Sequence, residues 1–225
     1  MTKIRSIFLS SESQSSLPLV DFCRQHELLL VRKSLISFAP VAFEFPENWE
    51  VVFFASPRAV DFFLSADFLL KPYQQLACIG SETKKHIESR GYTVSFSGEL
   101  AGKPDEIAQE FKAWLGERIA LFPQSTKSNK SIEAILPEEQ KVPLVVYETI
   151  EKPGVFDEAF SVYVFTSPSN LLSFLSQNSI PEDSKVIAWG DSTARVCLSR
   201  SVQADYILST STYAELEEIL QKIIV

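Results

Sequence analysis

Two stretches of the chain carry almost the same sequence, about 110 residues apart. Residues 51–64 read VVFFASPRAVDFFL, and residues 162–175 read VYVFTSPSNLLSFL. Each is an apolar run followed by Ser-Pro and an amphipathic segment, which predicts a strand leading into a helix. The similarity continues, with small gaps, between residues 76–97 and 186–209. A period this long exceeds that of a solenoid repeat and predicts a duplicated domain.

Short apolar runs alternate with segments of helical period along the chain. Helices are predicted at 104–115 and 212–224, the second beginning with a capping box formed by Thr212 and Glu215. Strands that alternate with helices form parallel sheets covered on both faces. The predicted fold class is α/β, with two similar flavodoxin-like lobes, each a parallel sheet flanked by helices. The candidate strands are residues 4–10, 28–31, 51–55, 76–80, 92–97, 118–122, 142–147, 161–166, 185–190 and 205–209.

Charge and cysteine usage restrict the class of protein. The net charge of -8 argues against binding to nucleic acid or to an anionic membrane, since both need basic patches. The apolar run near the N-terminus is too short for a signal peptide, and no later run is long enough to span a bilayer. The three cysteines form no C-x-x-C pair, which suits a reducing compartment. We therefore expect a cytoplasmic protein.

Motifs for metals and cofactors are missing from the sequence. The chain has only two histidines, His26 and His86, both in helix-like segments, which argues against a zinc or iron site. It contains neither G-x-x-x-x-G-K-[ST] nor G-x-G-x-x-G, and it lacks the G-x-S-x-G elbow of serine hydrolases. We expect no metal and no cofactor. Acid–base chemistry then falls to Tyr, Asp, Glu or Lys, and Tyr147, at the end of the strand VPLVVY, is the best placed.

The strand-to-helix turns carry the candidate binding residues. In both repeats a serine can cap the helix and proline occupies its first position, while GSET (80–83) and GDST (190–193) place glycine and hydroxyl residues at the next helix start. Such turns lie at the carboxyl edge of a parallel sheet, where free N–H groups suit carboxylates or phosphates. Helix capping alone also explains Ser-Pro, and aromatic packing also explains Tyr147. The candidates are Ser56, Arg58, Ser81, Thr83, Ser167, Ser169, Ser192 and Thr193.

Five segments together resemble the uroporphyrinogen-III synthase family, in the expected order from about residue 50 onward. One region departs from the family pattern. Many members follow their first strand with Thr-Arg-Pro, whereas IFLSSESQ has neither arginine nor proline, so a ligand role for this first loop stays open. The five segments are VVFFASPRAV, LACIGSETKKHIESRGY, VVYETIEKPG, VYVFTSPSNLLSFL and VIAWGDSTARV.

The resemblance implies lobes that exchange their N-terminal βαβ pieces. Residues 1–35 would join residues 152–225 in one lobe, and residues 38–149 would form the other. Linker strands near 30–37 and 144–152 would connect the lobes as a two-stranded linker, with LLLVRKSL pairing with LVVYETIEK. A cleft between hinged lobes is then expected.

The resemblance also implies a reaction. The family closes the linear tetrapyrrole hydroxymethylbilane into uroporphyrinogen III, inverting the last pyrrole ring and releasing water without a cofactor. Helix starts and the hydroxyls of Ser56, Ser81, Ser167 and Thr193 would hold the substrate carboxylates, with Arg58 and Lys84 adding charge. Tyr147 matches the family tyrosine that would protonate the leaving hydroxyl. The implied protein is a monomeric lyase whose small-molecule substrate comes, transiently, from hydroxymethylbilane synthase.

A second class shares the same architecture. A non-enzymatic two-lobed binding or sensor protein would also have duplicated α/β lobes and a ligand cleft. Such a protein binds a sugar or amino acid without turnover and usually carries an attached DNA-binding or signalling domain. The 225 residues contain no segment of that kind, which favours the enzyme.

Overall fold

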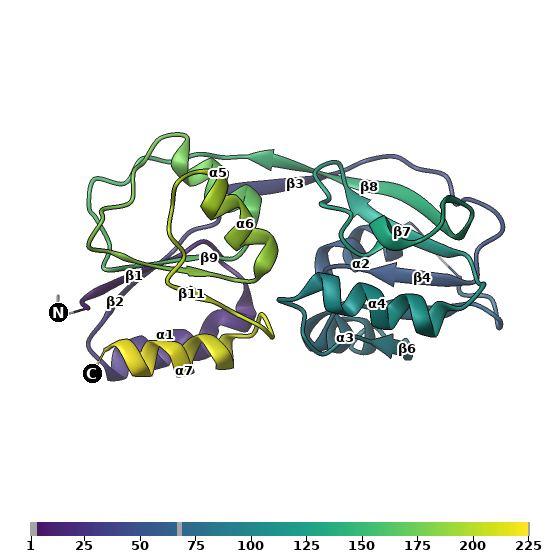
Figure 1. Cartoon of the computed structure of the whole chain (residues 1–225), viewed down its shortest axis with the longest axis horizontal. Helices are drawn as coiled ribbons and strands as arrows, with labels where there is room; N and C mark the ends of the chain where they lie inside the picture. Colours follow the sequence, from purple (N-terminus) through teal and green to yellow (C-terminus); the bar gives the residue numbers. More distant parts are fainter. Residues whose placement is uncertain (1–3, 67–68, 225) are drawn as a thin grey trace. The chain divides into compact units, whose positions relative to one another are not determined.

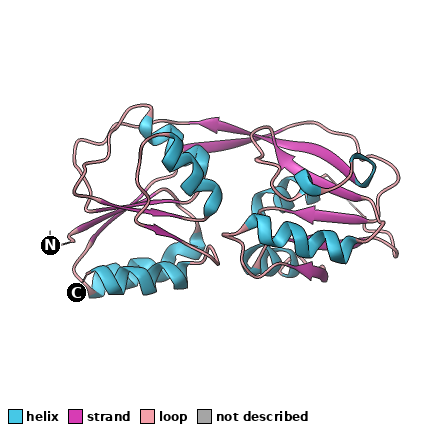
Figure 2. Cartoon of the chain, viewed as in Figure 1, coloured by secondary structure: helices cyan, strands magenta, loops and turns pink. Residues whose placement is uncertain are grey.

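The computed structural model describes residues 4–66 and 69–224 and divides into two compact units. Unit 1 contains the residues up to Ser37 together with those from Ile150 onward, and unit 2 is Phe38–Thr149. Each unit is built around a largely parallel sheet with helices packed on it (Figures 1 and 2). The predicted α/β fold class is confirmed.

Unit 1 has a five-stranded parallel sheet in the order β11-β10-β9-β1-β2. Counted along unit 1 alone, this order is 2-1-3-4-5, which is that of flavodoxin-like folds. The strands are β1 (Ser6–Leu9), β2 (Leu29–Arg32), β9 (Val162–Phe165), β10 (Lys185–Ala188) and β11 (Tyr206–Ile207). The helices are η1 (Gln14–Ser16), α1 (Leu17–Gln25), α5 (Pro168–Leu175), α6 (Asp191–Ser199) and α7 (Tyr213–Ile223).

Unit 2 is organised around a six-stranded sheet in the order β3-β8-β7-β4-β5-β6. If β7 and β8 are counted first, its parallel strands follow the same 2-1-3-4-5 order as unit 1. The strands are β3 (Ile36–Pro40), β4 (Val51–Phe54), β5 (Gln75–Cys78), β6 (Val94–Ser97), β7 (Ala120–Ser125) and β8 (Lys141–Glu151). The helices are α2 (Pro57–Leu64), α3 (Ser81–Glu88), α4 (Pro104–Leu115), η2 (Glu133–Ile135) and η3 (Glu138–Gln140).

Apolar side chains on both faces of each sheet form the cores. In β1, Ile7 packs with the residues of α1 and α7, whereas its neighbour Phe8 packs with those of α5, because successive strand residues point to opposite faces. Figure 1 shows α1 and α7 on one side of this sheet and α5 and α6 on the other. In unit 2, Phe54 faces α2 and α3, and Phe53 faces α4. All four residues of β4 and of β9 are buried, as expected for parallel strands covered on both faces.

The predicted linker pairing holds only at its end. The stretch LLLVRKSL was expected to pair with LVVYETIEK, but its residues Leu29–Arg32 are β2, paired with β1 inside the sheet of unit 1, and only its last residue, Leu35, bonds to the second stretch. The strand beside β8 is β3, and only its first two residues fall within the predicted linker strand near 30–37. Their pairing is antiparallel, since Lys152 donates to the Leu35 carbonyl and Val41 donates to the Val146 carbonyl. The divisions between the two units, after Ser37 and after Thr149, fall within these two strands.

The three cysteines are free and buried, with Cys23 and Cys197 in unit 1 and Cys78 in unit 2. Burial raises the pKa of each thiol, to about 11 for Cys23, where the charge of Glu217 adds to the effect, and to about 11 for Cys197. All three side chains are therefore neutral core residues at physiological pH.

A close backbone approach at Gly80 gives a test of the packing in unit 2. A Cβ atom at Gly80 would lie 2.7 Å from the Cβ atom of Ala101, whereas one at Gly154 would have its nearest neighbour, Leu35 Cδ2, at 3.8 Å. We expect Gly80→Ala to lower the free energy of unfolding by about 1–3 kcal/mol through overpacking. Urea titration measures this, with Gly154→Ala as the matched control. Equal urea midpoints for the two variants would contradict the close approach.

Candidate functional site

Hydroxyl side chains cluster where the strands of each unit end. Because the five strands of unit 1 run parallel, as do β4 to β8 of unit 2, their carboxyl ends share one edge of each sheet. Ligands of such folds bind at that edge. In unit 1 the residues at this edge include Ser10, Ser11, Thr166, Ser167, Ser192, Ser209 and Thr210. In unit 2 they include Ser56, Ser81, Ser97, Ser125 and Thr126.

The two Ser-Pro turns form helix caps, as predicted. The Ser56 hydroxyl accepts a hydrogen bond from the Ala59 N–H at 3.2 Å and begins α2. The Ser167 hydroxyl accepts from both the backbone N–H and the side-chain amide of Asn170, at 3.2 and 3.1 Å, and begins α5. A serine hydroxyl that accepts in this way still has its O–H to donate. The Ser167 cap can therefore also bind a carboxylate, whereas the Ser56 hydroxyl also bonds to the Tyr147 phenol and has its proton for a carboxylate only when it does not donate there.

The other turn residues divide into accessible and buried groups. Ser81 is exposed at the start of α3, and Ser169 and Ser192 are half-buried in the first turns of α5 and α6. Thr83 and Thr193 are each only 3% exposed, because they lie on the inward faces of their helices. Their predicted contact with a ligand stays a prediction, and both hydroxyls are covered in this conformation.

Tyr147 lies in an aromatic cluster of unit 2. Its ring stacks on Phe62, with centroids 5.1 Å apart and an interplanar angle of 12°, and meets Phe38 edge-on at 5.7 Å. The Arg58 guanidinium lies over the Phe38 ring, 4.3 Å from its centroid. Two predicted residues, Tyr147 and Arg58, are thus brought to the same aromatic side chain from distant parts of the sequence. We call Tyr147, Ser56, Arg58, Phe38 and Phe62 the Tyr147 cluster.

Burial controls the protonation of the Tyr147 phenol. The side chain is 8% exposed, and this burial raises its pKa above the usual value of 10.0. A hydrogen bond with the Ser56 side chain and the positive charge of Arg58 both act in the opposite direction, and burial has the larger effect. The phenol is therefore a protonated donor at neutral pH, with a cation close enough to stabilise its anion.

A β-bulge determines which way Tyr147 points. Along β8, Gln124 of β7 pairs with Val145, but the next residue, Ser125, pairs with Tyr147. The shift interrupts the alternation of the strand, and the consecutive residues Val146 and Tyr147 are both buried. A bulge of this kind commonly re-aims a side chain near a functional site. No pattern in the sequence indicated it.

Unit 1 has a hydroxyl network at the carboxyl ends of β1 and β9. The Ser10 hydroxyl accepts from the Thr166 N–H at 2.8 Å, and the Thr166 hydroxyl donates to the Ser10 carbonyl at 2.9 Å. In the order 2-1-3-4-5, this boundary between β1 and β9 is the switch point at which ligands bind. Neither residue was among the sequence candidates, although the position of Ser10 directly after the first strand was an available signal.

The loop before α7 depends on Glu215. Its carboxylate accepts from the N–H and hydroxyl of Ser209, both at 2.8 Å, and from the N–H and hydroxyl of Thr210, at 2.8 and 2.5 Å. The predicted capping box is thus only half right. The Thr212 hydroxyl does accept from the Glu215 N–H, at 3.3 Å, but the Glu215 side chain binds the preceding loop. The Tyr213 hydroxyl donates to Ser11, which ties this loop to the loop after β1.

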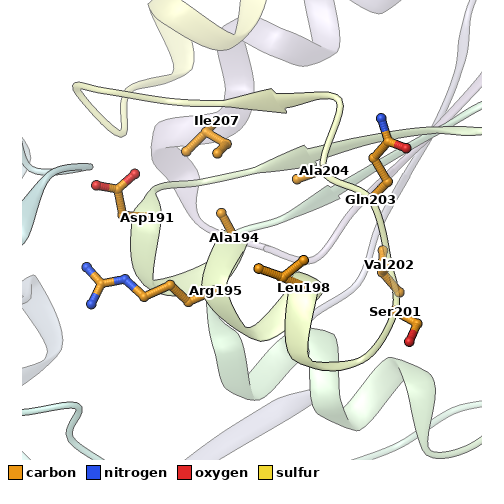
Figure 3. Close-up of a pocket in the computed structure, with 9 residues that line it drawn as sticks. All are labelled: Asp191, Ala194, Arg195, Leu198, Ser201, Val202, Gln203, Ala204 and Ile207. Atoms are coloured by element: carbon orange, nitrogen blue, oxygen red, sulfur yellow. The ribbon is translucent and has the colours of Figure 1, made fainter.

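A separate cavity of about 650 Å³ lies in unit 1 beside α6 (Figure 3). Its lining is mostly apolar and includes Leu198, which is 80% exposed, and Ile207 of β11. None of the predicted site residues lines this cavity. It reaches the GDST turn only through Asp191 at the start of α6.

The described residues show neither a metal-binding cluster nor a membrane-spanning helix. Within residues 4–66 and 69–224, no three His, Cys, Asp or Glu side chains lie together in an arrangement that could hold a metal ion. In the same part of the chain, no helix is long and apolar enough to cross a membrane.

Comparison with known families identifies the chain. A family model described as uroporphyrinogen-III synthase HemD matches residues 20–218. The chain belongs to the uroporphyrinogen-III synthase family. The resemblance predicted from the five segments is confirmed, and the match begins at residue 20, after the segment IFLSSESQ that departs from the family pattern.

Solved structures of uroporphyrinogen-III synthases share the fold. The uroporphyrinogen-III synthetase of Helicobacter pylori 26695 is 20% identical, with a TM-score of 0.66, over 97% of this chain and 100% of that one. A mutant uroporphyrinogen III synthase of the extremely thermophilic bacterium Thermus thermophilus is 13% identical, with a TM-score of 0.61, over 97% and 99% of the two chains. No curated protein gives a significant match. At these identities the structural likeness supports the synthase fold alone.

The Glu215 network predicts a pH-dependent stability. Burial, the largest single influence, raises the pKa of Glu215, but the hydrogen bonds from Ser209 and Thr210 together lower it below the usual value. A depressed folded-state pKa gives stability that is present above the unfolded-state value, about 4.3, and lost as the pH falls through the folded-state value. We expect Glu215→Gln to lower the free energy of unfolding by about 1–2 kcal/mol at pH 7 and by less at pH 3.

Urea titrations at the two pH values measure this effect. Glu218→Gln, which alters an exposed carboxylate on the same helix, is the control and should change neither midpoint. If Glu215→Gln lowers the free energy of unfolding by the same amount at both pH values, the result would contradict a role for the carboxylate charge.

Proposed function

We propose that this protein is a uroporphyrinogen-III synthase that closes hydroxymethylbilane to uroporphyrinogen III with inversion of the last pyrrole ring and release of water, and is thus a lyase. The family match over residues 20–218 supports this reaction. The observation that carries the proposed chemistry is the Tyr147 cluster, in which a buried, protonated phenol has Arg58 and Ser56 as neighbours. A non-enzymatic binding protein has no comparable support.

Tyr147 is proposed as the general acid for the loss of water. The phenol donates its proton to the departing hydroxyl as the C–O bond breaks, and the substrate becomes an electrophilic azafulvene. The resulting phenolate is stabilised by the Arg58 charge and by hydrogen bonding with Ser56. A proton released when the new ring regains aromaticity restores the phenol. The phenol therefore donates one proton and recovers one in each turnover.

Ring inversion depends on the conformation of the bound substrate. The last pyrrole attacks through its substituted carbon, and the spiro intermediate so formed reopens and recloses in the inverted orientation. The open chain can also close without inversion, so the protein must hold the reacting atoms in the productive arrangement. Such control requires many fixed contacts with the substrate side chains. It does not require a separate catalytic group for each step.

The carboxylates of the substrate are proposed to bind at the carboxyl edges of both units. The accessible hydroxyls of Ser56, Ser81, Ser167, Ser169 and Ser192 and the nearby helix starts supply donors. Thr83 and Thr193 belong to the same turns but would need to become uncovered. The net charge of -8 does not prevent binding, because salt screens distant charges beyond roughly 8–10 Å.

We also propose that the protein is a cytoplasmic monomer. Its three free, buried thiols suit a reducing compartment. Its substrate would come from hydroxymethylbilane synthase by a transient encounter, because hydroxymethylbilane closes spontaneously to the symmetric isomer when it is free in solution.

The reaction can be tested directly. Purified protein mixed with enzymatically generated hydroxymethylbilane should yield the type III isomer in excess over type I, and a chelator should leave that ratio unchanged. Chromatographic separation of the oxidised porphyrin isomers measures the outcome. A ratio equal to that of the reaction without protein would rule out the synthase function.

Tyr147→Phe tests the proposed acid. The variant keeps the ring contacts with Phe62 and Phe38 but removes the donor, and we expect the turnover rate to fall on the order of tenfold or more, as for a lost general acid. Tyr73→Phe removes a hydroxyl from a residue of unit 2 that is 61% exposed and is the control. Thermal unfolding should be similar in both variants. Full activity in Tyr147→Phe would leave Tyr147 with a packing role only.

A further inference from the structure

Arg32 ends β2 at the carboxyl edge of unit 1. It pairs in register with Leu9 of β1, and the Lys33 N–H donates to the Leu9 carbonyl at 3.0 Å. The residue after Leu9 is Ser10, which bonds to Thr166, the residue directly after β9. Arg32 therefore stands one strand away from the switch point of this sheet, on the β2 side. It is the only charged residue within these three strands, all of which the structure describes in full.

The guanidinium of Arg32 is incompletely satisfied by the protein. One terminal nitrogen, Nη2, donates to the Ser13 carbonyl at 2.7 Å. The Nε–H group is buried and has no acceptor among the described residues. Buried donors in native proteins nearly always have a partner, and a missing one often indicates an unseen ligand, ion or water. The arrangement thus leaves one side of the guanidinium without an acceptor.

Among the described residues Arg32 has no acidic partner, which separates it from Arg24 and Arg90 but not from Arg58 and Arg118. Arg24 and Arg90 each pair with an aspartate, at 2.8 and 2.5 Å. In the described part of the chain Arg32 forms no ion pair, although acidic residues outnumber basic ones by 29 to 21. Arg58, at the corresponding edge of unit 2, lies against an aromatic ring. Two arginines at carboxyl edges are thus held by neutral groups and keep their charge available for an anion.

We propose that Arg32 binds a carboxylate of the tetrapyrrole in unit 1. This inference rests on the proposed function and adds a substrate-binding residue to it. The carboxylate accepts from Nε–H and from one N–H of Nη2, the terminal nitrogen on the same side of the guanidinium, in the parallel, two-bond geometry that arginine favours, while the second N–H of Nη2 remains on the Ser13 carbonyl. Because Nε is covered in this conformation, binding requires a small local rearrangement that uncovers it.

This arrangement gives the first loop a defined part in binding. The loop lacks the arginine and proline that many family members have there, and its Ser13 carbonyl orients an arginine that comes from the next strand. The positive charge thus reaches the edge of the sheet from β2. A carboxylate bound there would lie close to the hydroxyl network of Ser10 and Thr166.

The test measures binding without turnover, with uroporphyrin III, a stable oxidised octacarboxylate, as the probe. Titration followed by porphyrin fluorescence should show a dissociation constant raised roughly tenfold in Arg32→Gln, as for a lost charge-assisted pair. Arg200→Gln removes the same charge from the exposed end of α6 and should leave the constant unchanged. An unchanged constant in Arg32→Gln would overturn the proposal.

Two further measurements separate binding from a structural role. Arg32→Lys keeps the charge and a donor for Ser13 but loses the two-bond geometry, so it should restore only part of the affinity. Full affinity in this variant would overturn the two-bond contact. In ¹⁵N-labelled wild type, the Arg32 Nε–H signal, assigned by its loss in Arg32→Gln, should shift on addition of uroporphyrin III. A signal that does not move at saturation would also overturn the proposal.

These measurements distinguish failure of the synthase function from failure of the Arg32 inference. A wild-type protein that makes no excess of the type III isomer, yet shows the Arg32 signal shift and the loss of affinity in Arg32→Gln, would refute the synthase function alone. A wild type that makes the type III isomer while Arg32→Gln binds the porphyrin normally would refute the Arg32 inference alone.

Discussion

The hydrogen bonds between β1 and β9 are the contacts on which unit 1 depends. They join Leu9 to Val164 in register, across a separation of about two thirds of the chain, and the Ser10–Thr166 bonds extend the pairing past the strand ends. Without them the N-terminal βαβ segment would have no sheet to join, and the inner faces of β9 and β10 would lose their cover. The closure of so long a loop costs entropy, which only a large buried core can offset.

The sequence predicted the elements that depend on local chemistry. Every predicted strand run overlaps a strand, and the helix at 104–115 has its predicted bounds, because apolar period and proline position act within a few residues. The segment ISFAP was missed, since it is short, ends in proline and is only partly buried as β3. The direction of the Glu215 side chain was also missed, because two hydroxyl residues of the preceding loop compete for its carboxylate.

Prediction of the site from the sequence is limited in the same way to features that depend on local chemistry. Ser56 and Arg58 were found from a repeated turn and Tyr147 from a strand end, but nothing in the sequence indicated that they form one cluster. Their association requires the bulge in β8 and the aromatic side chains of Phe38 and Phe62, which come from separate elements. The burial of Thr83 and Thr193 could not be predicted for a similar reason. The sequence repeat places both residues in the first turn of a helix, but it does not show which face of that helix is buried.

The placement of the buried cysteines gives each unit its own chemical reporter. With a thiol pKa near 11 for Cys23 and Cys197, only about one thiol in a thousand is ionised at pH 8, so alkylating reagents meet an inert group while the core is closed. Labelling then proceeds only through opening events. Because Cys78 lies in unit 2 and the other two lie in unit 1, mass spectrometry of the labelled peptides would follow the opening of each unit separately within one chain.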